Sequence, residues 1–219
     1  MLGLFSNNNF NEIARQELRN VINERAKVLC FSASDIEWQY NNRAESQPEG
    51  RYYGEQYAPF KDMGVKEDNF YIVHPTDDKE DVHNLFREAD VIVLLGGFME
   101  VLEQTLKYFD LWDMMKITGK HVIGISAGAF VSLDKYIVTP YVDMYYNDYY
   151  AAEGLGLLKN CRLLVHWHSD REEHQHILDY VVSETMEEMI DSQKDIIVIT
   201  LSEEEGIIVK NGFMTMVGR

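Results

Sequence analysis

The clearest chemical signal in the sequence is a serine between small residues, because positions 124–128 read Gly-Ile-Ser-Ala-Gly. The apolar pair 122–123 precedes this motif, and residues 127–131 can continue as a helix. The spacing G-x-S-x-G at a strand-to-helix turn is typical of a nucleophile elbow, whose strained backbone exposes the serine hydroxyl. The start of the helix also offers free N–H groups to an oxyanion. The pattern predicts that Ser126 is a nucleophile, and the plainer alternative is a glycine-rich turn with an incidental serine.

A nucleophilic serine needs a base and usually an acid that orients the base. His166 ends the apolar run 163–165, which places it at the carboxyl end of a strand and at the same edge as Ser126. His168 shares that face if the strand extends, so it is the reserve base. His121 begins the strand that leads to Ser126 and therefore lies at the opposite end. We predict His166 as the base.

Two candidates compete for the acid. The apolar run 196–201 leads into Ser202 and three glutamates at 203–205. Such a run is typical of a solvated turn, but a glutamate at a strand end could hold a charged imidazole. Asp170 is the competing acid because it follows His166 closely. The residues alone leave this choice open.

The histidines also form two H-x-H pairs, 166/168 and 174/176. Such pairs are weak evidence for a metal site without a matching third ligand. His174 and His176 stand among glutamates and a glutamine, which indicates a polar helix face. We therefore expect no metal at these residues.

The elements that must position these residues alternate between short apolar runs and amphipathic segments. The sequence predicts strands at 2–5, 27–31, 70–73, 91–95, 121–125, 163–165 and 196–201, a hairpin of 207–209 with 213–217, and helices at 8–25, from about 76, at 101–117 and at 172–190. Apolar strands that alternate with helices predict an α/β fold: a doubly wound, mostly parallel sheet with helices on both faces. Ligands then gather at the carboxyl ends of the strands, where Ser126 and the pair Gly96-Gly97 lie. The length of 219 residues fits one domain over 1–219.

Two segments depart from this pattern. Residues 35–60 are polar and rich in Tyr, Asn, Gln and Gly, so we predict a long excursion over the surface. Residues 141–150 contain five tyrosines, namely Tyr141, Tyr145, Tyr146, Tyr149 and Tyr150. Tyrosine clusters favour contact surfaces. This segment is either a pocket wall, a subunit interface that would make a homodimer, or a loop packed on its own domain.

Composition excludes several classes of function. The formal net charge of −17 argues against nucleic acid and against a polybasic membrane anchor. No apolar stretch approaches membrane-spanning length and the first residues do not read as a signal peptide, so we expect a cytoplasmic protein. Cys30 and Cys161 are too few for a disulfide framework or a zinc cluster, and their apolar neighbours predict buried free thiols.

Nearly the whole chain resembles the peptidase E and cyanophycinase family of serine peptidases. The similar segments are residues 4–7, the glycine-ended strand 91–97, the motif at 124–128, the segment 154–158 with 165–167, and the turn 201–203 with the spacing onward to 209 and 212. The resemblance implies a compact, flavodoxin-like sheet related to class I glutamine amidotransferases, which use cysteine at the elbow where this chain has serine. A glutaminase is therefore disfavoured.

The resemblance also implies roles for named residues. It implies a triad of Ser126, His166 and Glu203, in that chain order, with an oxyanion hole from the backbone N–H groups of Gly97 and Ala127. It implies hydrolysis of short peptides, best known in the family for dipeptides that begin with aspartate, and no metal or organic cofactor.

The substrate pocket is where the chain departs from the family. The usual Gly-Gly-Gly-Asn reads Gly96-Gly97-Phe98-Met99 here, which restricts the backbone at Phe98 and removes a polar side chain at Met99. We expect Gly96, Phe98 and Met99 to contact substrate, and we name Arg171 as the candidate for a substrate carboxylate. The alternatives are an esterase or amidase with the same triad, a non-catalytic binding member of the fold, and a metal-dependent hydrolase using the paired histidines.

Overall fold

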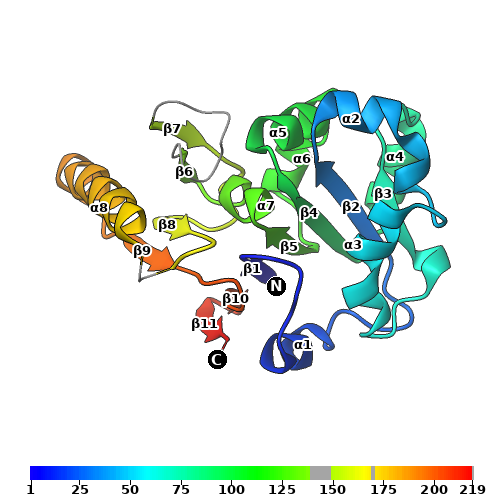
Figure 1. The fold of residues 1–219 in the computed structure, drawn as a ribbon, viewed down its shortest axis with the longest axis horizontal. Helices are drawn as coiled ribbons and strands as arrows, with labels where there is room; N and C mark the ends of the chain where they lie inside the picture. Colours follow the sequence, from blue (N-terminus) through cyan, green and yellow to red (C-terminus); the bar gives the residue numbers. More distant parts are fainter. Residues whose placement is uncertain (139–148, 169–170, 219) are drawn as a thin grey trace.

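A seven-stranded, mostly parallel sheet forms the centre of the computed structural model, which describes residues 1–138, 149–168 and 171–218 (Figure 1). The strand order is β11-β10-β1-β5-β4-β2-β3. The strands β1, β5, β4, β2 and β3 pair in parallel, whereas β10 and β11 form an antiparallel hairpin against β1. Their bounds are β1 (Leu2–Phe5), β2 (Val28–Ala33), β3 (Phe70–Val73), β4 (Val91–Gly97), β5 (His121–Ile125), β10 (Gly206–Lys210) and β11 (Phe213–Val217). This is the α/β architecture that the sequence predicts.

Helices cover both faces of this sheet, because alternate side chains of each strand face opposite sides. Leu29 and Ile92 pack in one core with α4, α5, α6 and α7, whereas Cys30 and Val93 pack in a second core with α1 and α3. The helices on the first face are α4 (Lys79–Glu88), α5 (Met99–Tyr108), α6 (Trp112–Lys116) and α7 (Ala127–Val131), and those on the second are α1 (Glu12–Leu18) and α3 (Arg51–Lys61). The predicted double winding is confirmed.

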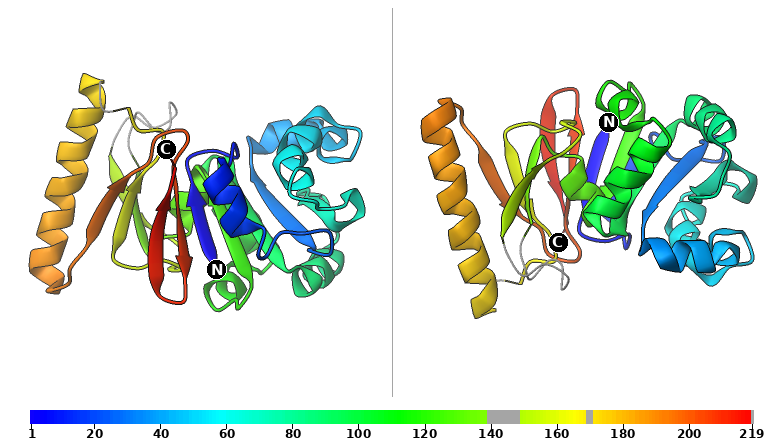
Figure 2. Two further views of the ribbon diagram at one scale, coloured as in Figure 1. Left: turned by 90° about the horizontal axis from the view of Figure 1, so that it is seen from below. Right: turned by 90° about the horizontal axis from the view of Figure 1, so that it is seen from above.

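Two small sheets stand outside the central one. The strands β6 (Lys135–Val138) and β7 (Tyr150–Glu153) pair antiparallel, and β8 (Cys161–Leu164) pairs in parallel with β9 (Ile197–Thr200). The long helix α8 (Glu172–Ser192) packs on β8 and β9 through Ile177 and Val181. These elements lie at one end of the molecule, and β3 lies toward the other (Figures 1 and 2).

The prediction of a surface excursion over residues 35–60 is wrong. The segment forms α2 (Ile36–Asn41), a short 3-10 helix η1 (Arg43–Ser46) and α3, with Tyr53, Tyr57 and Phe60 buried in the core. These three residues lie four and three positions apart, so a helix presents them on one face. Polar residues on the other face and Pro59 inside the helix obscure this pattern in the sequence.

Several predicted helices have different bounds. The helix expected over 8–25 covers only Glu12–Leu18, and the one expected from about Thr76 begins at Lys79, because the Asp78 side chain caps its first turn. The helix expected over 101–117 is α5 followed by α6, because Asp110 adopts a left-handed conformation with φ 55°. A second short 3-10 helix, η2 (Glu67–Asn69), precedes β3.

Both cysteines are buried free thiols, as predicted. None of the helices in the described ranges has the length and apolar character that a membrane crossing needs.

Candidate active site

Ser126 lies in a sharp turn between β5 and α7. Its backbone angles, φ 51° and ψ −112°, are strained for a non-glycine residue, a state that typically costs about 1–3 kcal/mol and persists only where the surroundings enforce it. The surroundings here are backbone atoms. A Cβ on Gly128 would lie 2.0 Å from the carbonyl oxygen of Leu94, and one on Gly124 would lie 2.5 Å from the carbonyl oxygen of Gly128. The two glycines of the motif therefore allow the close approach that makes the elbow.

His166 lies beside the serine hydroxyl, with its Nε2 atom 3.0 Å from Ser126 Oγ. It follows β8 and adopts a left-handed backbone with φ 57°. Its side chain is 38% exposed, so the ring borders solvent from which a substrate can approach. The structure brings His166, rather than the reserve candidate His168, to the serine.

Glu203 completes a hydrogen-bonded row of three side chains. Both of its carboxylate oxygens lie 2.9 Å from His166 Nδ1, on the side of the ring away from Ser126. A carboxylate only accepts, so Nδ1 carries the proton and Nε2 is left to accept the serine hydroxyl. Burial opposes ionisation of the Glu203 carboxyl, but hydrogen bonds from His166 and Asn7 and the charges of His166 and His168 outweigh it, so the pKa of Glu203 is lowered. The row can therefore move a proton from the hydroxyl to the ring.

Two polar residues at the end of β1, Ser6 and Asn7, contact this row, although no motif in the sequence indicates a role for them. The Asn7 side-chain amide donates to Glu203 Oε2 at 3.0 Å, and the His166 N–H donates to Ser6 Oγ at 2.6 Å. The available signal was their place directly after a buried strand, at the edge where ligands gather.

The glycine-rich end of β4 lies against the nucleophile. A Cβ on Gly96 would lie 3.2 Å from Ser126 Cβ, and one on Gly97, which has φ 134°, would lie 2.1 Å from the Ala33 carbonyl oxygen. That carbonyl already accepts the Phe98 N–H at 2.6 Å. The Phe98 N–H is therefore already hydrogen-bonded to β2. The two predicted donors to an oxyanion are the N–H groups of Gly97 and of Ala127, the first residue of α7.

The other predicted site residues vary. Phe98 is half-buried beside Gly97, and Arg171 is exposed just before α8. Met99 is only 2% exposed and packs in the core, so its predicted contact with substrate is wrong. Asp170, the competing acid, lies outside the described residues.

The prediction of a polar helix face is wrong for His174, whereas His176 is exposed. His174 is 2% exposed rather than on a polar surface, and its Nδ1 accepts the His168 N–H at 2.9 Å. In the described part of the chain, no group of three or more His, Cys, Asp or Glu side chains is arranged to hold a metal ion.

The tyrosine-rich segment is described only at its end. Tyr149 packs against Tyr180 with ring centroids 4.2 Å apart, and the Tyr150 hydroxyl donates to Glu100. Tyr141, Tyr145 and Tyr146 lie outside the described residues, so the role of this segment stays a prediction.

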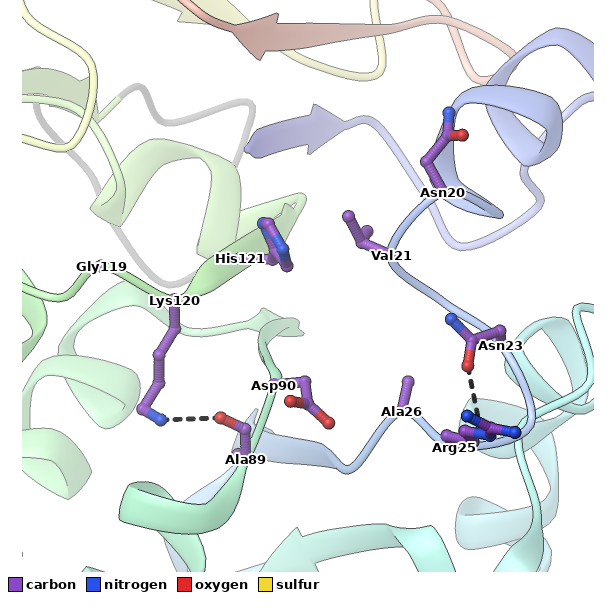
Figure 3. Close-up of a pocket in the computed structure, with 10 residues that line it drawn as sticks. All are labelled: Asn20, Val21, Asn23, Arg25, Ala26, Ala89, Asp90, Gly119, Lys120 and His121. Atoms are coloured by element: carbon purple, nitrogen blue, oxygen red, sulfur yellow. Dashed lines mark hydrogen bonds between the residues drawn. The ribbon is translucent and has the colours of Figure 1, made fainter.

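A separate pocket lies at the opposite edge of the sheet (Figure 3). It has a volume of about 530 Å³, and His121, the first residue of β5, and Asp90, just before β4, line it with Arg25 and Lys120. The amino ends of the strands form this edge, whereas Ser126 follows the carboxyl end of β5. This pocket is therefore distinct from the candidate active site.

Comparisons with known proteins identify the family and the fold of the chain. The sequence profile of peptidase family S51 matches residues 2–217. A crystal structure from Listeria monocytogenes EGD-e, provisionally described as a peptidase E protein, is 17% identical in sequence and has a TM-score of 0.64 over 100% of this chain and 98% of that one. At that identity the likeness shows a shared fold. None of the curated proteins compared with the chain matches it.

Proposed function

The chain belongs to peptidase family S51 and is a serine peptidase, and on that premise we propose that it hydrolyses short peptides through Ser126, His166 and Glu203. The observation that carries the proposal is the continuous row from the serine hydroxyl through both ring nitrogens to the carboxylate, with contacts of 3.0 and 2.9 Å. The strained backbone of Ser126 supports it, because such strain gathers at functional residues.

In the first half of the reaction, Ser126 Oγ attacks the carbonyl carbon of the scissile peptide bond while its proton moves to His166 Nε2. The carbonyl oxygen becomes an oxyanion, which the N–H groups of Gly97 and Ala127 bind. Each such donor typically stabilises the transition state by about 3 kcal/mol. The carbon–nitrogen bond then breaks, and the leaving amine takes the proton from Nε2. An acyl ester on Ser126 remains.

In the second half, water attacks the ester carbonyl and gives a proton to His166 Nε2. The bond to Ser126 Oγ breaks, the oxygen takes that proton back, and the carboxylic acid leaves. Glu203 stabilises the charged ring in both halves, which its lowered pKa permits because the carboxylate stays ionised.

The substrate class follows from the family rather than from a lined pocket. The resemblance implies short peptides, including those that begin with aspartate, and Arg171 is the exposed cation that we assign to a substrate carboxylate. The net charge of −17 disfavours acidic substrates unless such a cation offsets it.

The test is incubation with a mixed library of short peptides, read by mass spectrometry. Wild type runs beside Ser126→Ala, and two matched pairs resolve the roles: His166→Ala with His168→Ala, and Glu203→Gln with Glu204→Gln. We expect Ser126→Ala and His166→Ala to lose cleavage by at least about 10³-fold, and His168→Ala and Glu204→Gln to keep it.

Other results would contradict the mechanism or favour one of two alternatives, an esterase or a binding protein. Equal cleavage by wild type and Ser126→Ala would contradict the mechanism. Cleavage of ester but not peptide substrates would indicate an esterase. Ligand binding that survives Ser126→Ala, without turnover by wild type, would indicate a binding protein.

A further inference from the structure

The serine and its two proposed partners follow strands of different sheets. Ser126 follows β5 in the seven-stranded sheet, whereas His166 and Glu203 follow β8 and β9, which pair only with each other in the described ranges. The contacts of about 3 Å in this row therefore span two sheets. Their distances depend on residues that hold the two-stranded sheet against the seven-stranded one.

Ser6 makes the first link. It directly follows β1, the neighbour of β5, and it is completely buried. Its hydroxyl donates to the Leu201 carbonyl at 3.2 Å and accepts the His166 N–H at 2.6 Å. One side chain of the central sheet thus holds the ends of both β8 and β9, and it holds the histidine where its backbone is left-handed.

Asn7 makes the second link, to the acid itself. Its Nδ2 donates to Glu203 Oε2, and its Oδ1 accepts the Asn9 N–H at 2.7 Å. The second contact fixes which end of the amide faces the glutamate, so Asn7 presents a donor to the carboxylate. Asn7 is uncharged, and its effect on Glu203 therefore depends on this geometry.

We propose that Asn7 is a positioning residue that holds the Glu203 carboxylate against the His166 ring, while Ser6 fixes the main chain of His166. The end of β1 then sets the alignment of the whole row. The inference rests on the proposed function, because Asn7 contacts Glu203 and acts through it.

The positioning role of Asn7 can be measured through the pKa of Glu203. His166 and His168, on the segment after β8, face it, and Glu204 and Glu205 stand on its own turn, where Glu205 accepts the Ser202 N–H. Loss of the Asn7 donor removes one of the contacts that lower the pKa of Glu203, so that pKa rises. A carboxylate at position 7 raises it further through repulsion.

The test compares Asn7→Ala and Asn7→Asp with the matched control Asn8→Ala, whose amide contacts Gln56 instead of Glu203. The first readout is the rate at which a fluorophosphonate modifies the serine, followed from acidic to neutral pH. We expect Asn7→Ala to slow modification about tenfold. The acidic side of the curve of rate against pH should also move to higher pH. Asn7→Asp should move it further, and Asn8→Ala should match wild type.

The second readout is an NMR titration of the Glu203 carboxyl carbon, which needs no reactivity. The titration midpoint should rise from wild type to Asn7→Ala and again to Asn7→Asp. Variants that melt like wild type, react at its rate and titrate at its midpoint would overturn the inference. A wild type that the reagent leaves unmodified contradicts the proposed function instead, and the titration still decides the role of Asn7.

Discussion

The two halves of the candidate site sit in unequal surroundings. Ser126 follows β5, which has a paired strand on each side and four of its five residues buried. His166 and Glu203 follow β8 and β9, a two-stranded sheet whose Ile197 is 55% exposed. The nucleophile thus follows an enclosed strand of the central sheet, the enclosed region. Its partners follow the two-stranded sheet of β8 and β9, the thinner region.

Two kinds of constraint therefore hold the site. Around the serine the constraint is steric, because backbone atoms approach too closely for any side chain at the motif glycines. Around the histidine and glutamate the constraint is polar, through Ser6, Asn7 and the buried Arg162 in β8. Substitutions in the first region should therefore change stability through clashes, and those in the second through lost hydrogen bonds and charge.

The largest expected effect is loss of activity in the thinner region. Glu203→Gln removes the charge that stabilises the histidine and lets the ring adopt the tautomer with a proton on Nε2, which cannot accept from the serine. We expect kcat to fall about 10³-fold with little change in melting temperature. Steady-state kinetics beside Glu204→Gln, a neighbouring exposed glutamate, checks it. Full activity in Glu203→Gln would return Asp170 to consideration.

The next effect is on stability in the enclosed region. Gly128→Ala places a Cβ against the Leu94 carbonyl, which cannot move without shifting β4, so we expect a loss of about 3 kcal/mol in the free energy of unfolding. Gly54→Ala is the matched control, because it lies inside α3 with nothing within 4 Å of the added Cβ. It should stabilise by about 0.5–1 kcal/mol. Equal melting curves for the two variants would contradict the steric account.

The same contrast explains what the sequence could predict. The elbow was recognisable because steric demand forces glycine into a fixed spacing beside Ser126, and the strand periodicity placed His166 at the right edge. Asn7 was missed because a side-chain amide contact depends on three-dimensional register, which leaves no spacing in the chain. His174 was misjudged because its burial comes from tertiary packing against neighbours such as Trp167, while its sequence neighbours are polar. Met99 was assigned to the substrate pocket from its place in the glycine-rich turn, but the structure packs it in the core.

A smaller effect concerns the ion pairs of Arg162, which join β8 to α8 and to the turn before β6. Arg162, with its side chain 2% exposed, pairs with Asp134 at 3.2 Å and Glu188 at 2.7 Å. Arg162→Met removes the buried charge and leaves two partly solvated carboxylates, so we expect a loss of about 2 kcal/mol at neutral pH. The exposed pair Arg51–Glu55 supplies the control, because Arg51→Met should change nothing measurable.

The pH dependence of that loss has a definite sign. Burial opposes ionisation of Glu188, but hydrogen bonds from Lys135 and Arg162 outweigh it and lower its pKa. The stabilisation is therefore complete above the ordinary pKa of a glutamate, about 4.5, and disappears as pH falls through the lowered value. Urea unfolding should show the deficit of Arg162→Met shrinking over that acidic window. A deficit constant with pH would mean that packing, rather than charge, is what Arg162 contributes.

The smallest expected effect is on the reactivity of the two thiols. It compares the local stability of the two regions, because Cys30 lies in the central sheet and Cys161 in the two-stranded one. Burial raises the pKa of Cys30 in β2, and it raises the pKa of Cys161 in β8 to about 11 although Arg162 opposes the shift. Iodoacetamide at neutral pH should therefore leave activity unchanged while a fluorophosphonate abolishes it. In mild denaturant the thinner sheet opens first, so Cys161 should react before Cys30, as mass spectrometry of the labelled peptides can resolve. If Cys30 reacts first, the central sheet is the weaker of the two, and the polar contacts of Ser6 and Arg162 hold β8 more firmly than its exposure indicates.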